Sequence, residues 1–204
     1  MKVRDDELTE SGAEPPRSSA AEPRSVSISV VVSGHNRGRD VATAIDRVLA
    51  QRFPASEILV VDDGSTDDTI ARVARHREHI RLVRQHRLGR VAAHNRGAEL
   101  STGDWVAFVD FGAPWREDHL ERMAAAIAAT DGAADLYFGD GERASAEGGG
   151  THWQAARFDI ETPFELVGDA ARWALMRHQP MNLAAAVFCR QRFVEVGGFD
   201  FGAK

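Results

Sequence analysis

The sequence has few cysteines, no long apolar run and no excess of basic residues, and each of these features bears on the class of protein. It contains one cysteine, Cys189, so no internal disulfide can form and nothing ties the chain to an oxidising compartment. No apolar run approaches the roughly 20 residues that span a bilayer. Acidic residues outnumber basic ones by 31 to 25, a net charge of -6, which argues against a general nucleic-acid binder. We therefore expect a soluble, cytoplasmic protein of 204 residues.

Residues 1–25 differ in composition from the rest of the chain. They include three prolines, carry a net charge of -2 and have almost no large apolar side chain. Such a segment cannot bury enough surface to offset its ordering entropy. We expect a disordered tail, either a solvated leader or a docking or regulatory segment, followed by one domain over residues 26–204.

From residue 26 short apolar runs alternate with helical patterns. Asp40 is expected to cap the first helix, and Ser65 with Asp68 forms a capping-box pattern for the second. This alternation is typical of an α/β fold with a doubly wound, mostly parallel sheet. We expect strands at residues 26–32, 58–61, 80–83, 105–109 and 136–138, with helices at 41–49, 65–73, 91–100 and 120–127.

The alternation stops after Gly139. Residues 141–150 predict a loop or an irregular hairpin, because glycines and charges dominate them. A helix at 169–176, a strand at 182–188 and a short helix at 191–196 are expected to follow. This short, irregular part should cover one end of the sheet.

Several common nucleotide-binding motifs are missing from the sequence. No glycine-rich loop ending in Lys-Ser/Thr follows a strand, which excludes a phosphate-cradling ATPase loop. Gly34 and Gly38 do not make the dinucleotide fingerprint, so a dehydrogenase is disfavoured. A nucleotidyltransferase would need a glycine-rich, basic loop that residues 33–37 do not supply. Ligands of such a sheet bind at the carboxyl ends of its strands, where polar residues follow each apolar run.

Five segments form a recognisable series along the chain. They are VVVSGHNR at 30–37, ILVVDDGSTDDT at 58–69, AAHNRG at 92–97, STGDWVAFVD at 101–110 and VGGFD at 196–200. Together they resemble the family 2 glycosyltransferases, which have the GT-A fold. The resemblance implies a nucleoside diphosphate sugar as donor, and transfer of the sugar to an acceptor with inversion at the anomeric carbon.

The resemblance also implies donor-binding residues. His35, beside Ser33, matches the residue on which the nucleobase stacks, and an imidazole offers a smaller stacking area than the tyrosine common there. Asp63 matches the residue that contacts base or ribose. The neighbouring Asp62 is favoured as a turn residue that accepts backbone N–H bonds.

A basic stretch is expected to face the same nucleotide. His94 stands where many relatives have an arginine. Arg90, with Arg87 and Arg96, is a candidate for phosphate contact, and each of these arginines has a solvated surface role as its alternative.

The metal motif departs from the family pattern. Asp110 matches its first aspartate, whereas Gly112 and Ala113 replace the later ones. One carboxylate is few for a hard Mn²⁺ or Mg²⁺ ion. The hypotheses are an altered metal dependence helped by Asp140 or Glu142, or a site that has lost catalysis.

The acceptor side has one carboxylate near the motif at 196–200. Asp200 is the candidate general base, with a turn-capping role as its alternative. Because the sequence continues for four residues beyond it, we expect a short acceptor side completed by a partner protein or chain. The competing interpretation is a silent nucleotide-sugar-binding module that acts with such a partner.

The tryptophans have two interpretations as well. Trp115, Trp153 and Trp173 are candidates for a sugar-stacking platform, but residues of this type more often pack in the core. Cys189 is expected to be inert packing.

Overall fold

A computed structural model describes residues 25–109, 115–143, 150–151, 153–154 and 181–200. The expected tail, apart from Ser25, lies outside these residues, as do the expected helix at 169–176, Asp110 and Trp173.

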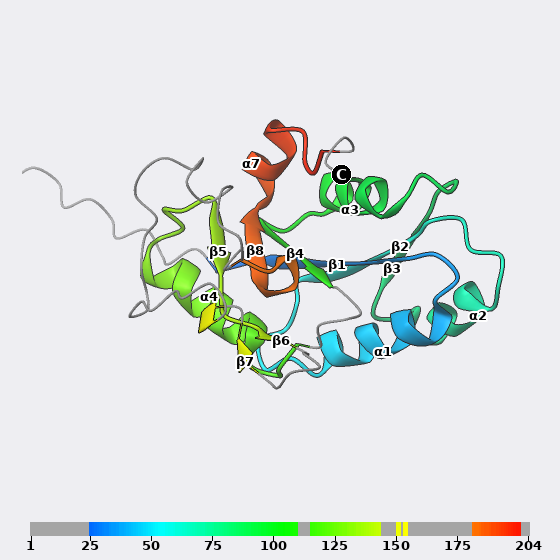
Figure 1. Cartoon of the computed structure of the whole chain (residues 1–204), viewed down its shortest axis with the longest axis horizontal. Helices are drawn as coiled ribbons and strands as arrows, with labels where there is room; N and C mark the ends of the chain where they lie inside the picture. The colour runs from blue at the N-terminus through cyan, green and yellow to red at the C-terminus, as the bar shows by residue number, and fades with distance from the viewer. Residues whose placement is uncertain (1–24, 110–114, 144–149, 152, 155–180, 201–204) are drawn as a thin grey trace, which may run out of the picture.

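A six-stranded sheet forms the centre of the molecule (Figure 1). Its order is β3-β2-β1-β4-β8-β5, with the first four strands parallel and β8 antiparallel to both of its neighbours. This confirms the expected α/β fold and mostly parallel sheet. The strands are β1 (Ile28–Gly34), β2 (Glu57–Asp62), β3 (Arg81–Arg84), β4 (Trp105–Val109), β5 (Leu136–Phe138) and β8 (Ala186–Cys189).

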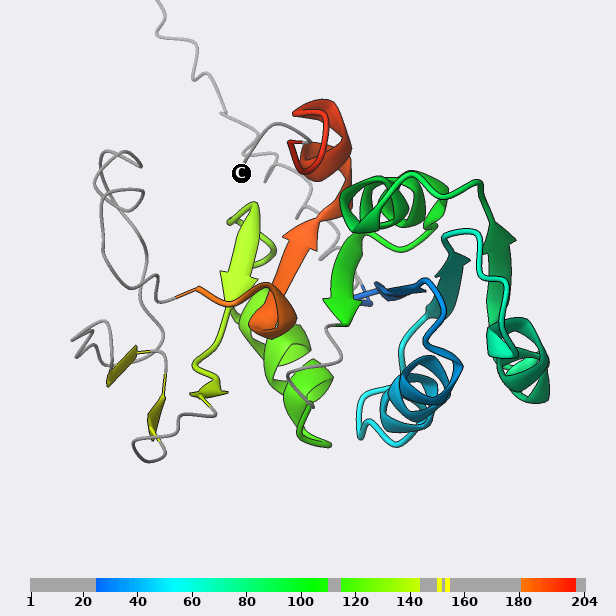
Figure 2. The same cartoon turned by 45° about the vertical axis from the view of Figure 1, so that its right-hand side comes forward.

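Helices cover both faces of this sheet (Figures 1 and 2). Side chains of a strand alternate between its two faces, so Val30 and Val32 pack in one apolar cluster and Val31 in the other. The first cluster includes side chains of α1, α2 and α4, and the second those of α3 and α7. These helices are α1 (Gly38–Leu49), α2 (Thr69–Val73), α3 (Arg90–Leu100), α4 (His119–Ala129) and α7 (Arg190–Glu195), with short 3-10 turns η1 (Ala74–His76) and η2 (Leu183–Ala185).

Helix α3 approaches the sheet closely at Gly97. A methyl group added there would overlap the side chain of Val31, which is fully buried in β1. Glycine therefore allows the helix backbone to lie directly on the central strand, and this contact sets the height of α3 above the sheet.

Two expected helix starts are wrong. Helix α1 has Arg37 as its N-cap, and Asp40 lies in its first turn. Helix α2 begins at Thr69 after an Asp68 N-cap, and the Ser65 hydroxyl accepts a hydrogen bond from Asn36 N. Other partners compete for these side chains: the Asp40 carboxylate accepts from Arg37 and the Asp68 carboxylate from Arg72, while the loop after β1 supplies the donor to Ser65.

The part after Gly139 follows the expected elements in part. Two-residue strands β6 (Glu142–Arg143) and β7 (Gly150–Thr151) pair antiparallel, where a loop or irregular hairpin was expected. The expected strand at 182–188 is shorter, because residues 183–185 form η2 and β8 begins at Ala186, while α7 occupies the expected short helix. Strand β8 enters the sheet between β4 and β5. Within the described part of the chain, we find no helix with the length and hydropathy needed to cross a bilayer.

Candidate nucleotide-sugar site

The carboxyl ends of β1 and β2 lie side by side at one edge of the sheet. Gly34 at the end of β1 is in register with Asp62 at the end of β2. On the other side of β1, Val32 pairs with Val109, the last residue of β4. The chain order reverses between β1 and β4, which is the switch point where ligands of open α/β sheets bind.

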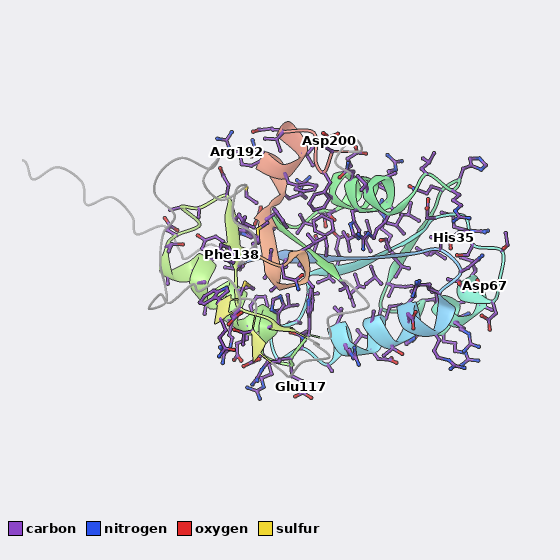
Figure 3. The ribbon with its side chains drawn as sticks, viewed as in Figure 1. His35, Asp67, Glu117, Phe138, Arg192 and Asp200 are labelled. Atoms are coloured by element: carbon purple, nitrogen blue, oxygen red, sulfur yellow. The ribbon has the colours of Figure 1, made fainter. Side chains whose placement is uncertain are left out.

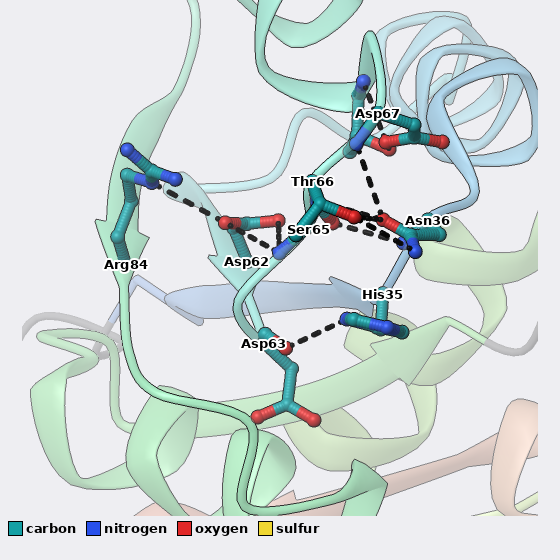
Figure 4. Close-up of polar contacts among 9 residues, drawn as sticks. His35, Asn36, Asp62, Asp63, Ser65, Thr66, Asp67 and Arg84 are labelled. Atoms are coloured by element: carbon teal, nitrogen blue, oxygen red, sulfur yellow. Dashed lines mark hydrogen bonds and ion pairs between the residues drawn. The ribbon is translucent and has the colours of Figure 1, made fainter.

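Asn36 joins the loop after β1 to the loop after β2 (Figure 4). Its Oδ1 accepts hydrogen bonds from Thr66 N at 2.8 Å and Asp67 N at 3.3 Å, while its own N–H donates to Ser65 Oγ at 2.9 Å. The φ angle of Asn36 is 52°, a left-handed conformation that asparagine tolerates better than most residues. The two loops therefore form one connected unit.

Asp62 stabilises the turn that follows β2. Both carboxylate oxygens accept from Ser65 N, at 3.2 and 3.3 Å, and one also accepts from Arg84 Nε at 3.3 Å. The residue is 2% exposed. The expectation that Asp62 is a turn residue is confirmed.

Asp63 binds a third loop, the one between β3 and α3, and so holds it near the carboxyl ends of β1 and β2. Its Oδ1 accepts from Gln85 Nε2 and Leu88 N, both at 2.8 Å, and its Oδ2 accepts from Gly89 N at 2.9 Å. Burial alone raises the pKa of Asp63, but these three hydrogen bonds and the nearby His35 outweigh it, so the pKa lies below its usual range. The ionised carboxylate thus orders the loop, and Oδ2 retains capacity for another donor.

His35 lies next to Asp63 and is held by it (Figure 4), at the end of the molecule where Figure 3 also shows Asp67. The Nδ1–H of the half-buried ring donates to the Asp63 carbonyl oxygen at 2.9 Å. A carbonyl can only accept, so in the neutral ring Nε2 is left as an acceptor. The structure therefore brings two of the expected nucleotide residues, His35 and Asp63, together. Of the others, Ser33 is buried at the end of β1, and Arg90 is exposed at the start of α3.

His94 belongs to α3, and its side chain is buried. It is 5% exposed, and its ring centroid lies 5.0 Å from that of Phe108 and 6.0 Å from that of Phe199. Phe188 and Phe193 complete this aromatic cluster. The ring thus packs against apolar side chains, and its contact with a nucleotide stays a prediction.

Asn95 was not singled out from the sequence, yet it anchors the segment before Asp200. Its Nδ2 donates to Phe199 O and its Oδ1 accepts from Phe199 N, both at 2.9 Å. A Cβ on Gly198 would lie 2.5 Å from that same Oδ1, and Gly198 has a φ of 73°. The pairing spans 104 residues, so no local pattern could have indicated it. Asp200 itself is exposed, and its role as a base stays a prediction.

Trp115 and His119 pack together at the start of α4. Their ring centroids lie 4.5 Å apart, and the Trp115 indole N–H donates to the Ala184 carbonyl oxygen. Trp115 also packs against the first apolar cluster, which supports the core interpretation. Burial lowers the pKa of His119 to about 4, against the opposing effect of Asp118, and its Nε2 has no hydrogen-bond partner among the described residues.

The described residues do not supply a set of metal ligands. Among them, no group of three His, Cys, Asp or Glu side chains is placed to hold an ion. The Asp140 carboxylate accepts from Gly141 N at 2.8 Å and Trp153 N at 3.0 Å, so it supports the hairpin. Trp153 also contacts Phe138, with ring centroids 6.3 Å apart.

Comparison with known proteins identifies the class. The model of the family "Glycosyl transferase family 2" matches residues 29–178, most of the chain. The protein therefore belongs to glycosyltransferase family 2. Glycosyltransferase AglE of Haloferax volcanii is 32% identical over 84% of this chain and 55% of its own length, and the uncharacterized glycosyltransferase YibD of Escherichia coli is 38% identical over 41% and 25%.

Solved structures agree on the GT-A fold. The mannosyltransferase PcManGT of Pyrobaculum calidifontis, in complex with GDP-Man and Mn²⁺, has a TM-score of 0.62 at 24% identity, covering 90% of this chain and 50% of its own. Residues 1–349 of TarS of S. aureus in complex with UDP-GlcNAc give 0.57 at 20%, covering 84% and 47%. The chain thus spans a quarter to about half the length of these relatives.

Proposed function

We propose that the chain binds a nucleoside diphosphate sugar at the carboxyl edge of its sheet and transfers the sugar, with inversion, to an acceptor. The domain that does so extends over residues 26–204. The observation that carries the proposal is the connection of three loops at this edge through the side chains of Asn36 and Asp63. A ligand would meet a prearranged surface there, so little ordering entropy would oppose binding.

Each expected binding residue has a role in this proposal. The His35 ring stacks on the base, and Asp63 Oδ2 accepts from a base N–H or a ribose hydroxyl. Ser33 and Arg90 bind the ribose and diphosphate, since an arginine presents several donors to phosphate oxygens. His94 supports this surface from the buried side of α3.

Metal binding and acid–base chemistry are part of the proposal too. Asp110, which lies outside the described residues, would be the protein ligand of a Mn²⁺ or Mg²⁺ ion that offsets charge on the leaving diphosphate. Asp200 would take the proton of the acceptor hydroxyl. A partner protein or a further chain would complete the acceptor side. The relative PcManGT was solved with GDP-Man and Mn²⁺, which makes this donor and this ion suitable first probes.

Calorimetric titration tests the donor site. UDP, GDP, UDP-GlcNAc and GDP-Man are titrated into the protein with and without Mn²⁺, and into the His35→Ala variant. Loss of a base–aromatic contact should weaken binding roughly 5- to 150-fold, corresponding to about 1–3 kcal/mol. Arg122→Gln, an exposed arginine on α4, is the control and should bind as the parent does. Absence of binding by every nucleotide would refute the donor proposal.

Turnover separates the two forms of the proposal. Release of nucleoside diphosphate from a bound donor would support a transferase. Binding without any release, with a panel of sugar and lipid-linked acceptors, would favour the silent module that acts with a partner.

A further inference from the structure

One stretch of the chain has a charge opposite to that of the whole. Residues 71–96 contain eight arginines and one glutamate, a net charge of +7 in a chain whose total is -6. The remainder of the chain therefore carries -13. The arginines are Arg72, Arg75, Arg77, Arg81, Arg84, Arg87, Arg90 and Arg96.

The first part of this stretch, the end of α2, η1 and β3, lies on one side of the sheet, and Figure 2 shows β3 as the outermost strand there. Its last residues, 90–96, belong to α3, which packs over β1. Three arginines form ion pairs with Asp68, Asp62 and Glu99. The other five are exposed and form no ion pair with any described residue: Arg75, Arg77, Arg81, Arg87 and Arg90.

Exposed leucines lie among these arginines. Leu82 is 38% exposed and Leu88 is 65% exposed. Residues 71–96 contain no phenylalanine, tyrosine or tryptophan, the larger rings on which single-stranded nucleic acids stack; their aromatic side chains are four histidines, of which His94 is buried. Exposed arginines with an exposed leucine in the same edge strand suit a surface of lipid headgroups and acyl chains.

We propose that this surface docks onto a bilayer containing anionic phospholipids. The basic surface is defined by Arg75, Arg77, Arg81 and Leu82. Arginines attract the negative headgroups, and the leucine contacts the boundary between headgroups and acyl chains. These arginines, in an otherwise acidic molecule, set which side turns toward the membrane.

The basic surface is separable from the proposed donor site. Strand β3 runs parallel to β2, so its first residue, Arg81, lies at the amino edge of the sheet, opposite the loops that hold Asp63. Arg75 and Arg77 come just before this strand. Their substitution should leave nucleotide binding unchanged, so the docking proposal and the donor proposal can fail independently.

Charge on an edge strand has an alternative explanation. Arginines at an edge prevent unwanted pairing with the edge of another sheet. That role requires no membrane and predicts no binding to vesicles. The two explanations therefore differ in a direct measurement.

Vesicle cosedimentation makes this measurement on the full chain. The parent should bind vesicles of phosphatidylglycerol and phosphatidylcholine, bind poorly to phosphatidylcholine alone, and be released by salt. Arg75→Gln with Arg77→Gln should weaken binding about 25-fold, because each arginine near the surface contributes about fivefold. Arg122→Gln with Arg192→Gln, two exposed arginines on α4 and α7, removes the same charge elsewhere and should change binding little.

A gain-of-binding variant guards against misfolding. Glu78→Gln removes the one acidic residue of the stretch and should strengthen vesicle binding about fivefold. A variant that lost the docking surface by misfolding would not show this gain. The proposal is overturned if the parent ignores anionic vesicles, or if both double variants lose binding equally. Binding of poly(U) RNA in preference to vesicles, lost with Arg75 and Arg77, would also overturn it.

Discussion

Replacing Asp63 by asparagine removes the charge that orders the loop between β3 and α3 while keeping the shape of the side chain. In the variant, the amide oxygen can take the place of Oδ1, but the amide N–H₂ then faces Gly89 N, another donor. One hydrogen bond to a charged group is lost, and the Gly89 N–H is left without its acceptor. We expect a loss of about 2 kcal/mol in the free energy of unfolding, and about 4 kcal/mol for Asp63→Ala, which removes all acceptors.

The pH dependence supplies a second readout of the same contact. The folded-state pKa of Asp63 is depressed, so the ionised form contributes stability above the unfolded value, and this contribution is lost as pH falls through the folded pKa. The difference in unfolding free energy between the parent and Asp63→Asn should therefore be largest near neutral pH and shrink below about pH 4.

Urea unfolding followed by circular dichroism measures both effects. Asp131→Asn, the same chemical change at an exposed turn residue, is the control and should unfold like the parent. If Asp63→Asn has the same urea midpoint as the parent, or if their difference does not change with pH, the reasoning about this loop is refuted.

Three further variants test other contacts. Burial keeps the pKa of His119 near 4, so the protein loses stability as pH falls below 6.5, by about 3 kcal/mol in full. His119→Phe, which keeps an aromatic ring packed on Trp115, should flatten this pH dependence. An unchanged pH profile in urea unfolding would contradict this prediction. Asn95→Ala removes two hydrogen bonds to Phe199 and should cost about 2 kcal/mol, with faster amide exchange at Phe199; equal exchange would argue against the anchor. Gly97→Ala should lower the thermal midpoint, at a cost of about 1–3 kcal/mol, because its methyl overlaps the central strand.

The sequence predicts the parallel core well because each strand is a short apolar run ended by polar or glycine residues. The turn role of Asp62 was also predictable, since its carboxylate bonds a backbone N–H three residues later. The position of β8 between β4 and β5 was not, because strand pairing depends on the tertiary fold and not on local pattern.

The site shows the same division between local and distant contacts. The loop after β1 and the loop after β2 carry a recognisable motif, but motif alone does not tell that Asp63 bonds a third loop more than 20 residues away. Asn95 illustrates the limit more clearly, because its partner lies 104 residues further along. Such contacts arise only when the sheet brings distant segments together.

Hydrogen–deuterium exchange with bound nucleotide tests the central claim most directly, because it locates the binding edge. With saturating UDP or GDP, in the presence of Mn²⁺, we predict slower exchange of amides in residues 35–38, 63–69 and 85–90, and unchanged exchange in α4 and β5. Protection confined to other parts of the chain, or no protection by any nucleoside diphosphate, would contradict the proposed donor site at the carboxyl edge of the sheet.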